Sequence, residues 1–258
     1  MISVVVPTLN GAQYLDEALA SALSQDVELE VVVQDGGSTD ATAHVVASFN
    51  DPRIRFGHGR DHGQADAVNR AVAAASGDWF VWLNADDKLA PGALAAASVA
   101  LDDDVDVAYG DSLLVNRHGR VLRTYLAPPS ISRDYVLRHG MAVFSGSMIF
   151  RRSRFLEWGG LDSTLSFCMD FELLARIADR PRVRHVPVVV GVFRMHGASK
   201  SGTRPWAFLR EHRAVRRRFT EASRWDDVAH HARFAAYILT SPLRYSRVWS
   251  SMRKVKQR

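Results

Sequence analysis

Residues 2–35 read ISVVVPTLNGAQYLDEALASALSQDVELEVVVQD and contain two apolar runs separated by a helical pattern. The runs ISVVV (2–6) and LEVVVQ (29–34) are short and rich in valine, which is typical of buried strands. Between them, YLDEALASALSQ (14–25) repeats apolar residues at the spacing of an amphipathic helix. The stretch therefore predicts a strand–helix–strand unit, from which parallel sheets are built.

The same alternation of strand and helix patterns continues as far as residue 110. The further predicted strands and helices are 40–49 (helix), 54–57 (strand), 64–76 (helix), 78–83 (strand), 91–102 (helix) and 105–110 (strand). Repeated units with nearly continuous apolar strands indicate an α/β fold, a Rossmann-like and mostly parallel sheet flanked by helices. Ligands of such sheets bind beyond the carboxyl ends of the strands.

After Asp111 the pattern loosens. Residues 112–126 read as a hairpin that turns at His118-Gly119. Two more strands and two more helical segments are predicted at 146–150, 170–179 (helix), 188–194 and 206–240 (helix). We expect a second half of the domain that departs from the regular alternation.

Composition limits the class of protein. The 258 residues are 47% hydrophobic, which is enough for one large domain or one domain with a small appendage. The one cysteine, Cys168, allows no internal disulfide, and this fits a reducing compartment. No apolar run is long enough for a transmembrane helix, and the first residues lack the basic start of a signal peptide.

Polar side chains follow four of the predicted strands at the point where each strand ends. They are Thr8, Asp35, Asp61 and the group Asn84, Asp86 and Asp87. Because the carboxyl ends of parallel strands meet at one edge of a sheet, we expect these side chains to line a common rim. The sequence therefore predicts a binding site at this rim.

Each of these groups also has a local explanation. In DGGSTDAT (35–42), the residues Ser38, Thr39 and Asp40 are typical N-caps of the following helix. Asp35 lies too early for such a cap, and the glycines after it allow a close backbone approach to a ligand, so we favour a ligand role.

The adjacent acids Asp86 and Asp87 precede Pro91, which suits the first turn of the next helix, by several residues. One of them could shape a turn. A divalent cation explains them better, because it would offset their repulsion and prefers hard oxygen ligands such as carboxylates and phosphates.

Two other nucleotide-binding motifs are absent. A dinucleotide site needs G-x-G-x-x-G after the first strand, where this chain has PTLNGAQ with one glycine. The sequence also contains no P-loop pattern. Nucleotide binding, if present, must therefore use carboxylates and a metal instead of a glycine cradle.

Four stretches together resemble the family-2 glycosyltransferases. They are VVVPTLNGAQYLDEALASALSQ, VVVQDGGSTDAT, DHGQADAVNRAVAAASGDWFVWLNADD and GGLDSTLSFCMDFELLAR, which occur in the family's order within residues 1–200. The resemblance implies the GT-A fold and an enzyme that uses a nucleotide-diphosphate-sugar donor. It implies a catalytic domain of 1–203, with a nucleotide-sugar-binding half (1–110) and an acceptor-binding half (111–203), before a basic helical region (204–258).

The resemblance also implies roles for single residues. Thr8 and Asp35 match the residues that hold the nucleotide, and Asn84-Ala85-Asp86 stands where the family has its D-x-D metal motif. The residues of the stretch that closes around the donor are Asp61, Gln64, Asp66 and Asn69. Asp170 matches the catalytic base, and His196 a histidine that contacts metal or diphosphate.

Two positions depart from the family pattern. Asn84 replaces the first aspartate of D-x-D, so a metal would rest on Asp86, Asp87 or both, with His196. Met169 stands where a glutamate often precedes the base, which leaves Asp170 as the acid there and Glu172 as its nearest competitor.

The expected reaction is a transfer that depends on Mn²⁺ or Mg²⁺ and inverts the anomeric carbon, in the synthesis of a cell-envelope polysaccharide or glycolipid. Two alternatives stay open at this point. One is a degenerate domain that binds nucleotide-sugars or glycans without turnover, and the other is a sugar-phosphate nucleotidyltransferase, although PTLNGAQ lacks the glycine- and basic-rich loop that such enzymes need.

The C-terminal region is strongly basic. Residues 204–258 hold 14 Lys and Arg against 4 Asp and Glu, a local charge of +10, whereas the whole chain carries +5. Basic residues mixed with aromatic ones predict affinity for an anionic membrane surface, with a solvated appendage as the alternative. We expect a cytoplasmic protein, peripheral at the inner face of the membrane, with a glycan or lipid-linked acceptor and no nucleic-acid partner.

Overall fold

The computed structural model describes residues 1–140, 143–179, 182–197, 203–220, 228–229 and 232. Contacts divide the chain into two compact units, Met1–His196 and Gly197–Arg258. The predicted boundary at 203 stays a prediction. Within the described residues, no helix combines the length and apolar character needed to cross a bilayer.

The first unit is built on one mixed sheet, whose strand order is β3-β2-β1-β4-β8-β6-β9-β5, with β7 paired to β6. The strands are β1 (Ile2–Thr8), β2 (Leu29–Asp35), β3 (Ile54–His58), β4 (Trp79–Trp82), β5 (Lys88–Leu89), β6 (Val107–Asn116), β7 (Val121–Tyr125), β8 (Met148–Arg151) and β9 (Val183–Met195). Strands β1 to β4 are mutually parallel, as predicted. Beyond β4 the sheet is mixed, because β8 enters antiparallel between β4 and β6, while β6 and β9 are parallel.

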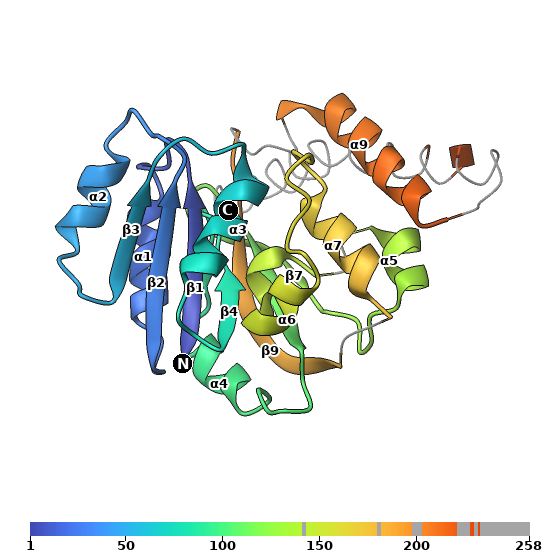
Figure 1. Ribbon diagram of the computed structural model, residues 1–258, viewed down its shortest axis with the longest axis horizontal. Helices are drawn as coiled ribbons and strands as arrows, with labels where there is room; N and C mark the ends of the chain where they lie inside the picture. Colours follow the sequence, from blue (N-terminus) through green and yellow to red (C-terminus); the bar gives the residue numbers. More distant parts are fainter. Residues whose placement is uncertain (141–142, 180–181, 198–202, 221–227, 230–231, 233–258) are drawn as a thin grey trace, which may run out of the picture. The chain divides into compact units, whose positions relative to one another are not determined.

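Helices cover both faces of the sheet (Figure 1). The helices of the first unit are α1 (Leu15–Leu23), α2 (Thr42–Ser48), α3 (Gln64–Ala74), α4 (Ala93–Ser98), α5 (Arg133–His139), α6 (Arg152–Glu157) and α7 (Met169–Ile177), with the 3-10 turn η1 (Ser145–Ser147). The second unit contains α9 (Pro205–Arg218). The predicted helices match α1 to α4, α7 and the described part of α9. The short elements β5, α5 and α6 were not predicted, since their few residues carry no full apolar period.

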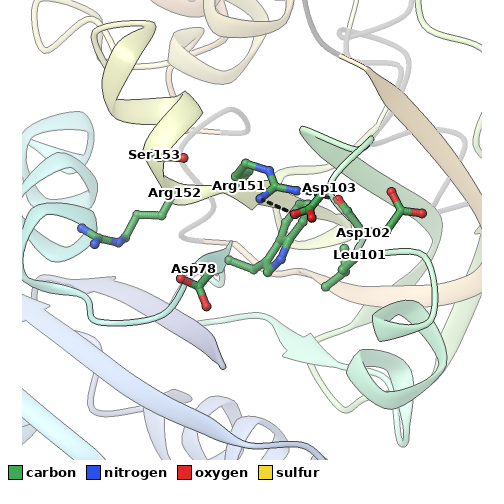
Figure 2. Close-up of a pocket in the computed structure, with 8 residues that line it drawn as sticks. Asp78, Leu101, Asp102, Asp103, Arg151, Arg152 and Ser153 are labelled. Atoms are coloured by element: carbon green, nitrogen blue, oxygen red, sulfur yellow. Dashed lines mark hydrogen bonds and ion pairs between the residues drawn. The ribbon is translucent and has the colours of Figure 1, made fainter.

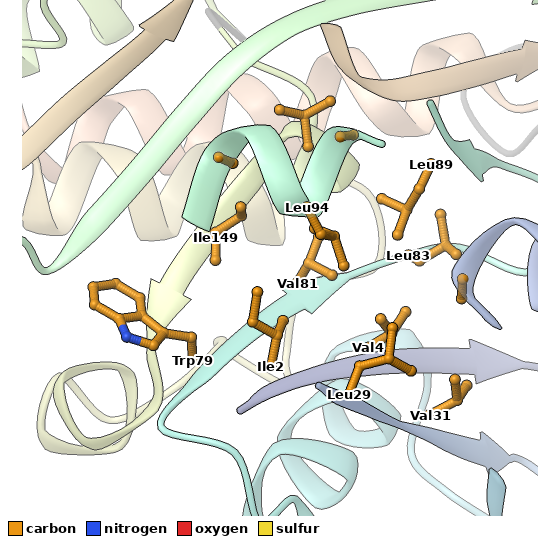
Figure 3. Packing of buried hydrophobic residues seen from close by; sticks show 14 of the residues in the cluster. Ile2, Val4, Leu29, Val31, Trp79, Val81, Leu83, Leu89, Leu94 and Ile149 are labelled. Carbon is orange, nitrogen blue, oxygen red and sulfur yellow. The ribbon is translucent and has the colours of Figure 1, made fainter. Parts of the chain in front are cut away.

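The main core lies on the sheet face that α1 and α4 cover. Val4, Val31 and Val81 stand in register on neighbouring strands and are fully buried. Figure 3 shows Leu94 of α4 above this row. Burying a side chain of this size contributes about 1.5–3 kcal/mol, so the valine runs are enough to hold the first four strands together.

A smaller aromatic cluster lies on the opposite face. The ring of Phe80 stacks on Phe150 at a centroid distance of 5.3 Å and meets the edge of Phe155 at 4.8 Å. The helix α3 packs on β1 and β2 of the same sheet. Both faces of the central strands are therefore covered, so a ligand can reach these strands only at their ends.

The hairpin predicted at 112–126 is confirmed. Strands β6 and β7 pair antiparallel, with Ser112 opposite Tyr125 and Val115 opposite Val121. Gly119 has a φ of +76° in the turn between them. Glycine adopts that left-handed backbone conformation without the cost of a Cβ, which is why His118-Gly119 predicts a turn.

An ion network fastens the N-terminal end of β6. The buried Asp106 carboxylate accepts hydrogen bonds from Arg182 N (3.0 Å) and Arg154 Nε (3.3 Å). Burial alone would raise the pKa of Asp106, but the bonds from Arg182 outweigh it and hold that pKa below its ordinary value. Asp106 thereby joins α6 and the start of β9 to β6.

We expect Asp106→Asn to lower the unfolding free energy at pH 7 by about 1–3 kcal/mol, since it removes a charged acceptor of several hydrogen bonds. A depressed folded-state pKa contributes stability above the unfolded pKa of about 3.9, and this contribution is lost as pH falls through the folded value. The deficit should therefore shrink in urea denaturation at pH 3. The matched control is Asp104→Asn, because its carboxylate also bonds Arg182 but its side chain is 88% exposed. An equal deficit at both pH values, or in the control, would contradict this account.

Candidate active site

The strand register gathers the first predicted residues at one rim. Thr8 pairs with Asp35, and Asp35 pairs with His58, across the carboxyl ends of β1, β2 and β3. Residues in register on parallel strands point to the same side of the sheet, so the three side chains form a row. Thr8 is 5% exposed and Asp35 is fully buried.

The carboxylate of Asp35 is engaged by protein donors. It accepts hydrogen bonds from Ser38 N (3.1 Å) and Ser38 Oγ (2.5 Å), and its other oxygen lies 2.7 Å from His58 Nδ1. The His58 side chain is 55% exposed. Asp35 therefore orients an imidazole at the rim, and His58 is a candidate that the sequence analysis missed. The available signal was a histidine at the end of a short strand beside Asp35.

The hydroxyl of Thr8 is a buried polar atom without a hydrogen-bond partner in the described part of the chain. A Cβ at Gly11 would come within 2.4 Å of this hydroxyl, so only glycine lets the loop after β1 close over Thr8. Buried hydroxyls normally find partners. A buried hydroxyl without a partner at a strand end is therefore a candidate for a hydrogen bond to a ligand.

Asp61 reaches the same rim from the loop after β3. Its Oδ1 accepts a hydrogen bond from Gly63 N (2.9 Å), and a Cβ on Gly36 would lie 2.5 Å from its Oδ2. The small size of Gly36 therefore makes room for the Asp61 carboxylate. Asp66, in the first turn of α3, pairs instead with Arg70 and His62.

A chain of hydrogen bonds builds the corner after β4. Gln64 Nε2 donates to Asn84 Oδ1 (2.8 Å), and Asn84 Nδ2 donates to Asp87 Oδ2 (2.9 Å). Arg194 N donates to the other oxygen of Asp87 (2.8 Å). Asp87 is 5% exposed, and burial, with the neighbouring Asp86 carboxylate, raises the pKa of Asp87 to about 8. Its carboxylate thus faces the protein.

Asp86 points the other way from this chain. Its Oδ2 lies 2.8 Å from His196 Nε2, and the side chains of Asp86 and His196 are 37% and 12% exposed. The described residues contain no ready cage of three or more metal-binding side chains. A carboxylate beside an imidazole still fits a cation whose remaining ligands are diphosphate oxygens, so Asp86 and His196 can accept the predicted Mn²⁺ or Mg²⁺.

Arg194 holds this corner together and was not singled out in the sequence. Its side chain is 2% exposed and donates to Asp86 O (3.0 Å), Arg117 O (3.1 Å) and Glu17 Oε2 (2.7 Å). Its guanidinium also lies 4.5 Å from the centroid of the Tyr14 ring. The available signal was an arginine at the end of the apolar run VVVGVFR (188–194), because a buried charge in a strand needs hydrogen-bond acceptors.

The remaining predicted residues lie around α7. Asp170 is half-buried in the first turn of α7, and its Oδ1 accepts a hydrogen bond from Phe171 N (2.7 Å). Glu172, its competitor, is 4% exposed and paired with Arg176 (2.8 Å). Asn69 of α3 bonds the backbone of Leu161 with both ends of its carboxamide. Its donor contact therefore stays a prediction.

A separate cavity of about 330 Å³ lies at the other end of β4, next to Asp78 (Figure 2). The arginines there already bond backbone carbonyls, Arg151 those of Val105 and Asp102 and Arg152 that of Gly77. Its lining includes none of the predicted site residues.

We expect Arg194→Met to lower the unfolding free energy by about 3 kcal/mol, because it removes several buried hydrogen bonds and one side of an ion pair. Lys88→Met is the matched control, since Lys88 Nζ bonds the same Glu17 oxygen (3.0 Å) from a more exposed position. It should cost less than about 1 kcal/mol. Chemical denaturation measures both, and equal losses would refute the anchoring role of Arg194.

Comparison with solved structures identifies the fold. The structure of S. aureus TarS 1-349 in complex with UDP-GlcNAc aligns with a TM-score of 0.68 at 19% identity, covering 90% of this chain and 71% of that one. The mannosyltransferase PcManGT from Pyrobaculum calidifontis, in complex with GDP-Man and Mn²⁺, aligns with a TM-score of 0.64 at 23% identity, covering 100% and 80%. These likenesses confirm the predicted GT-A fold.

Sequence comparison identifies the family. An uncharacterized glycosyltransferase of Rickettsia felis is 30% identical over 189 residues, 69% of this chain and 31% of the relative. A hyaluronan synthase of Pasteurella multocida is 28% identical over 206 residues, 78% of this chain and 21% of the relative. The chain thus spans less than a third of the length of these two relatives. The family model for glycosyl transferase family 2 matches residues 3–159, more than half of the chain. The chain therefore belongs to glycosyl transferase family 2, as its four motifs predicted.

Proposed function

We propose that the chain transfers a sugar from a nucleotide-diphosphate-sugar to an acceptor hydroxyl, with inversion at the anomeric carbon. One observation carries the proposal. Gln64, Asn84 and Asp87 form a hydrogen-bonded chain that turns Asp87 inward and leaves Asp86 beside His196. The corner thus presents a partly exposed carboxylate at a strand end, where α/β sheets bind their ligands.

The donor's nucleoside would lie along the rim of β1 to β3. The orphaned hydroxyl of Thr8 and the carboxylate of Asp61 support hydrogen bonds to its base and ribose. Asp35 would act there through the imidazole of His58 that it orients. One neighbour structure holds UDP-GlcNAc and another GDP-Man, so the nucleotide and the sugar stay open.

Asp86 and His196 would hold the divalent cation. Bound there, Mn²⁺ or Mg²⁺ supplies a Lewis acid that neutralises the charge growing on the leaving diphosphate. The sequence analysis offered Asp87 as a metal ligand and placed Asn84 at the nucleotide-sugar-binding rim. Both would instead support the loop, because their polar atoms already bond Gln64, Arg194 or each other.

Asp170 would accept the proton of the acceptor hydroxyl. The hydroxyl oxygen then attacks the anomeric carbon opposite the leaving group, and the bond from that carbon to the diphosphate oxygen breaks. One attack without a covalent intermediate inverts the carbon. The pairing of Glu172 with Arg176 supports Asp170 as the base, since it leaves Glu172 committed to an internal ion pair.

Asp170→Asn should slow hydrolysis of the donor at least about 100-fold, because general base catalysis contributes that much, while UDP binding with Mn²⁺ stays within twofold. Asp86→Ala should instead weaken Mn²⁺-dependent UDP or GDP binding at least about tenfold. Calorimetry and product analysis on a panel of UDP- and GDP-sugars measure both. Asp16→Asn, an exposed carboxylate on α1, is the matched control.

The outcomes separate the alternatives. A domain that only binds would take up UDP and Mn²⁺ without any hydrolysis by the wild-type chain. A nucleotidyltransferase would form nucleotide-sugar from a sugar phosphate and nucleoside triphosphate. Normal turnover by Asp170→Asn would remove that residue as the base.

We further propose that the acceptor is a growing cell-envelope glycan or a lipid-linked glycan. The polysaccharide synthase among the relatives supports the first, and the local charge of +10 in residues 204–258 supports a membrane surface. Most of that region, including residues 244–258, lies outside the described residues.

The full chain should pellet with vesicles that contain anionic lipid at low salt and be released as ionic strength rises, because screening weakens surface attraction. Replacing Arg253, Lys254, Lys256 and Arg258 by glutamine should reduce binding severalfold. Equal binding to neutral vesicles, or none at low salt, would refute the membrane proposal.

A further inference from the structure

The geometry points to Asn69 as a positioning residue that joins the donor half of the site to the turn leading to Asp170. This assignment rests on the proposed function, because it takes Asp170 as the base. It differs from the donor contact that the family resemblance implied for Asn69. Four sets of contacts carry it.

The first is a reciprocal pair of hydrogen bonds. Asn69 Nδ2 donates to Leu161 O (2.9 Å), and Asn69 Oδ1 accepts from Leu161 N (2.9 Å). One carboxamide thus matches both backbone groups of one residue, as a neighbouring strand would. The two residues are 92 positions apart in sequence, so the pair is a tertiary link between α3 and the turn. Little of the amide is left to bind a sugar.

The second is the shape of the turn beneath Asn69. Gly159 and Gly160 have φ values of +85° and +67°, which favour glycine. A Cβ on Gly160 would lie 2.6 Å from Asn69 Oδ1. The backbone of this turn therefore approaches Asn69 more closely than any other residue type allows.

The third is an anchor from the opposite side. Arg176 of α7 donates to Trp158 O and to Gly160 O (2.6 Å) and pairs with Glu172. The turn is therefore fastened both to α3, through Asn69, and to α7, whose first turn carries Asp170. The same link explains why Glu172 is buried as an ion pair.

The fourth is the other end of α3. Its first residue, Gln64, donates to Asn84 at the corner that carries Asp86. The helix α3 therefore has two attachments. Gln64 at its start bonds the corner proposed for the metal, and Asn69 bonds the turn that precedes the proposed base. A hydrogen-bonded helix does not stretch, so α3 sets the separation of the two groups.

Asn69→Ala should lower kcat for donor hydrolysis at least about tenfold, since a displacement of about 1 Å can cost 100-fold in rate. The KM for the donor and the affinity for UDP with Mn²⁺ should stay within twofold. The substrate is whichever of a panel of UDP- and GDP-sugars the wild-type chain hydrolyses fastest. Thermal melting checks that the variant is folded, and Asn69→Asp, which keeps the size and the acceptor for Leu161 N, replaces it if not.

Gly160→Ala tests the same link from the turn, with no change to any side chain that could touch the donor. It should reproduce the loss in kcat, and the double variant should lose little more, because both changes break one contact. Ser163→Ala is the matched control. It removes the longer bond of Asn69 (3.4 Å) and should behave as the wild type.

Two results would overturn the assignment. If Asn69→Ala raises the KM or weakens UDP binding at least tenfold while Gly160→Ala does not, Asn69 contacts the donor. If both variants are folded and keep the wild-type kcat, the link positions nothing. A wild-type chain that turns over no donor overturns the proposed function itself and this assignment with it, which is a distinguishable failure.

Discussion

The corner proposed for the metal depends on a buried arginine, because a buried charge needs hydrogen-bond partners. Arg194 is 2% exposed, and its side chain and main-chain nitrogen together contact Asp86 O, Asp87 and Glu17. Such a group is costly to bury unless every donor finds an acceptor. The requirement draws β9, the loop after β4 and α1 into one arrangement, and this arrangement presents Asp86 beside His196.

The two adjacent aspartates have different surroundings and different roles. Asp87 turns inward, where Asn84 and Arg194 N bond its oxygens and burial favours its protonated form. Asp86 turns toward His196 and stays partly exposed. The pair therefore consists of one supporting and one presenting carboxylate. Asn84 in place of an aspartate fits this division, because its amide can donate to Asp87 as well as accept from Gln64.

The helix α3 has a comparable dual role. It packs on β1 and β2 as a cover for the sheet, yet its polar residues Gln64 and Asn69 bond two separate loops. Sequence alone read both as part of a donor-closing stretch. The sequence does not distinguish a polar side chain that bonds the backbone from one that bonds a ligand. The difference lies in which segment folds against it, here a turn 92 positions away.

The parallel half of the sheet and the hairpin at Gly119 were predictable from the amino-acid sequence, because valine runs, helical periods and glycine turns are local signals. The four motifs indicated the family. The sequence also located Thr8, Asp35 and Asp61 at one rim, since parallel strands share their carboxyl ends. Tertiary contacts were needed to show that β8 runs antiparallel, that Asp35 bonds His58 and that Asp87 faces inward. Those outcomes depend on donors from distant segments such as Arg194, and hydrogen-bond partners far apart in the chain leave no periodicity to read.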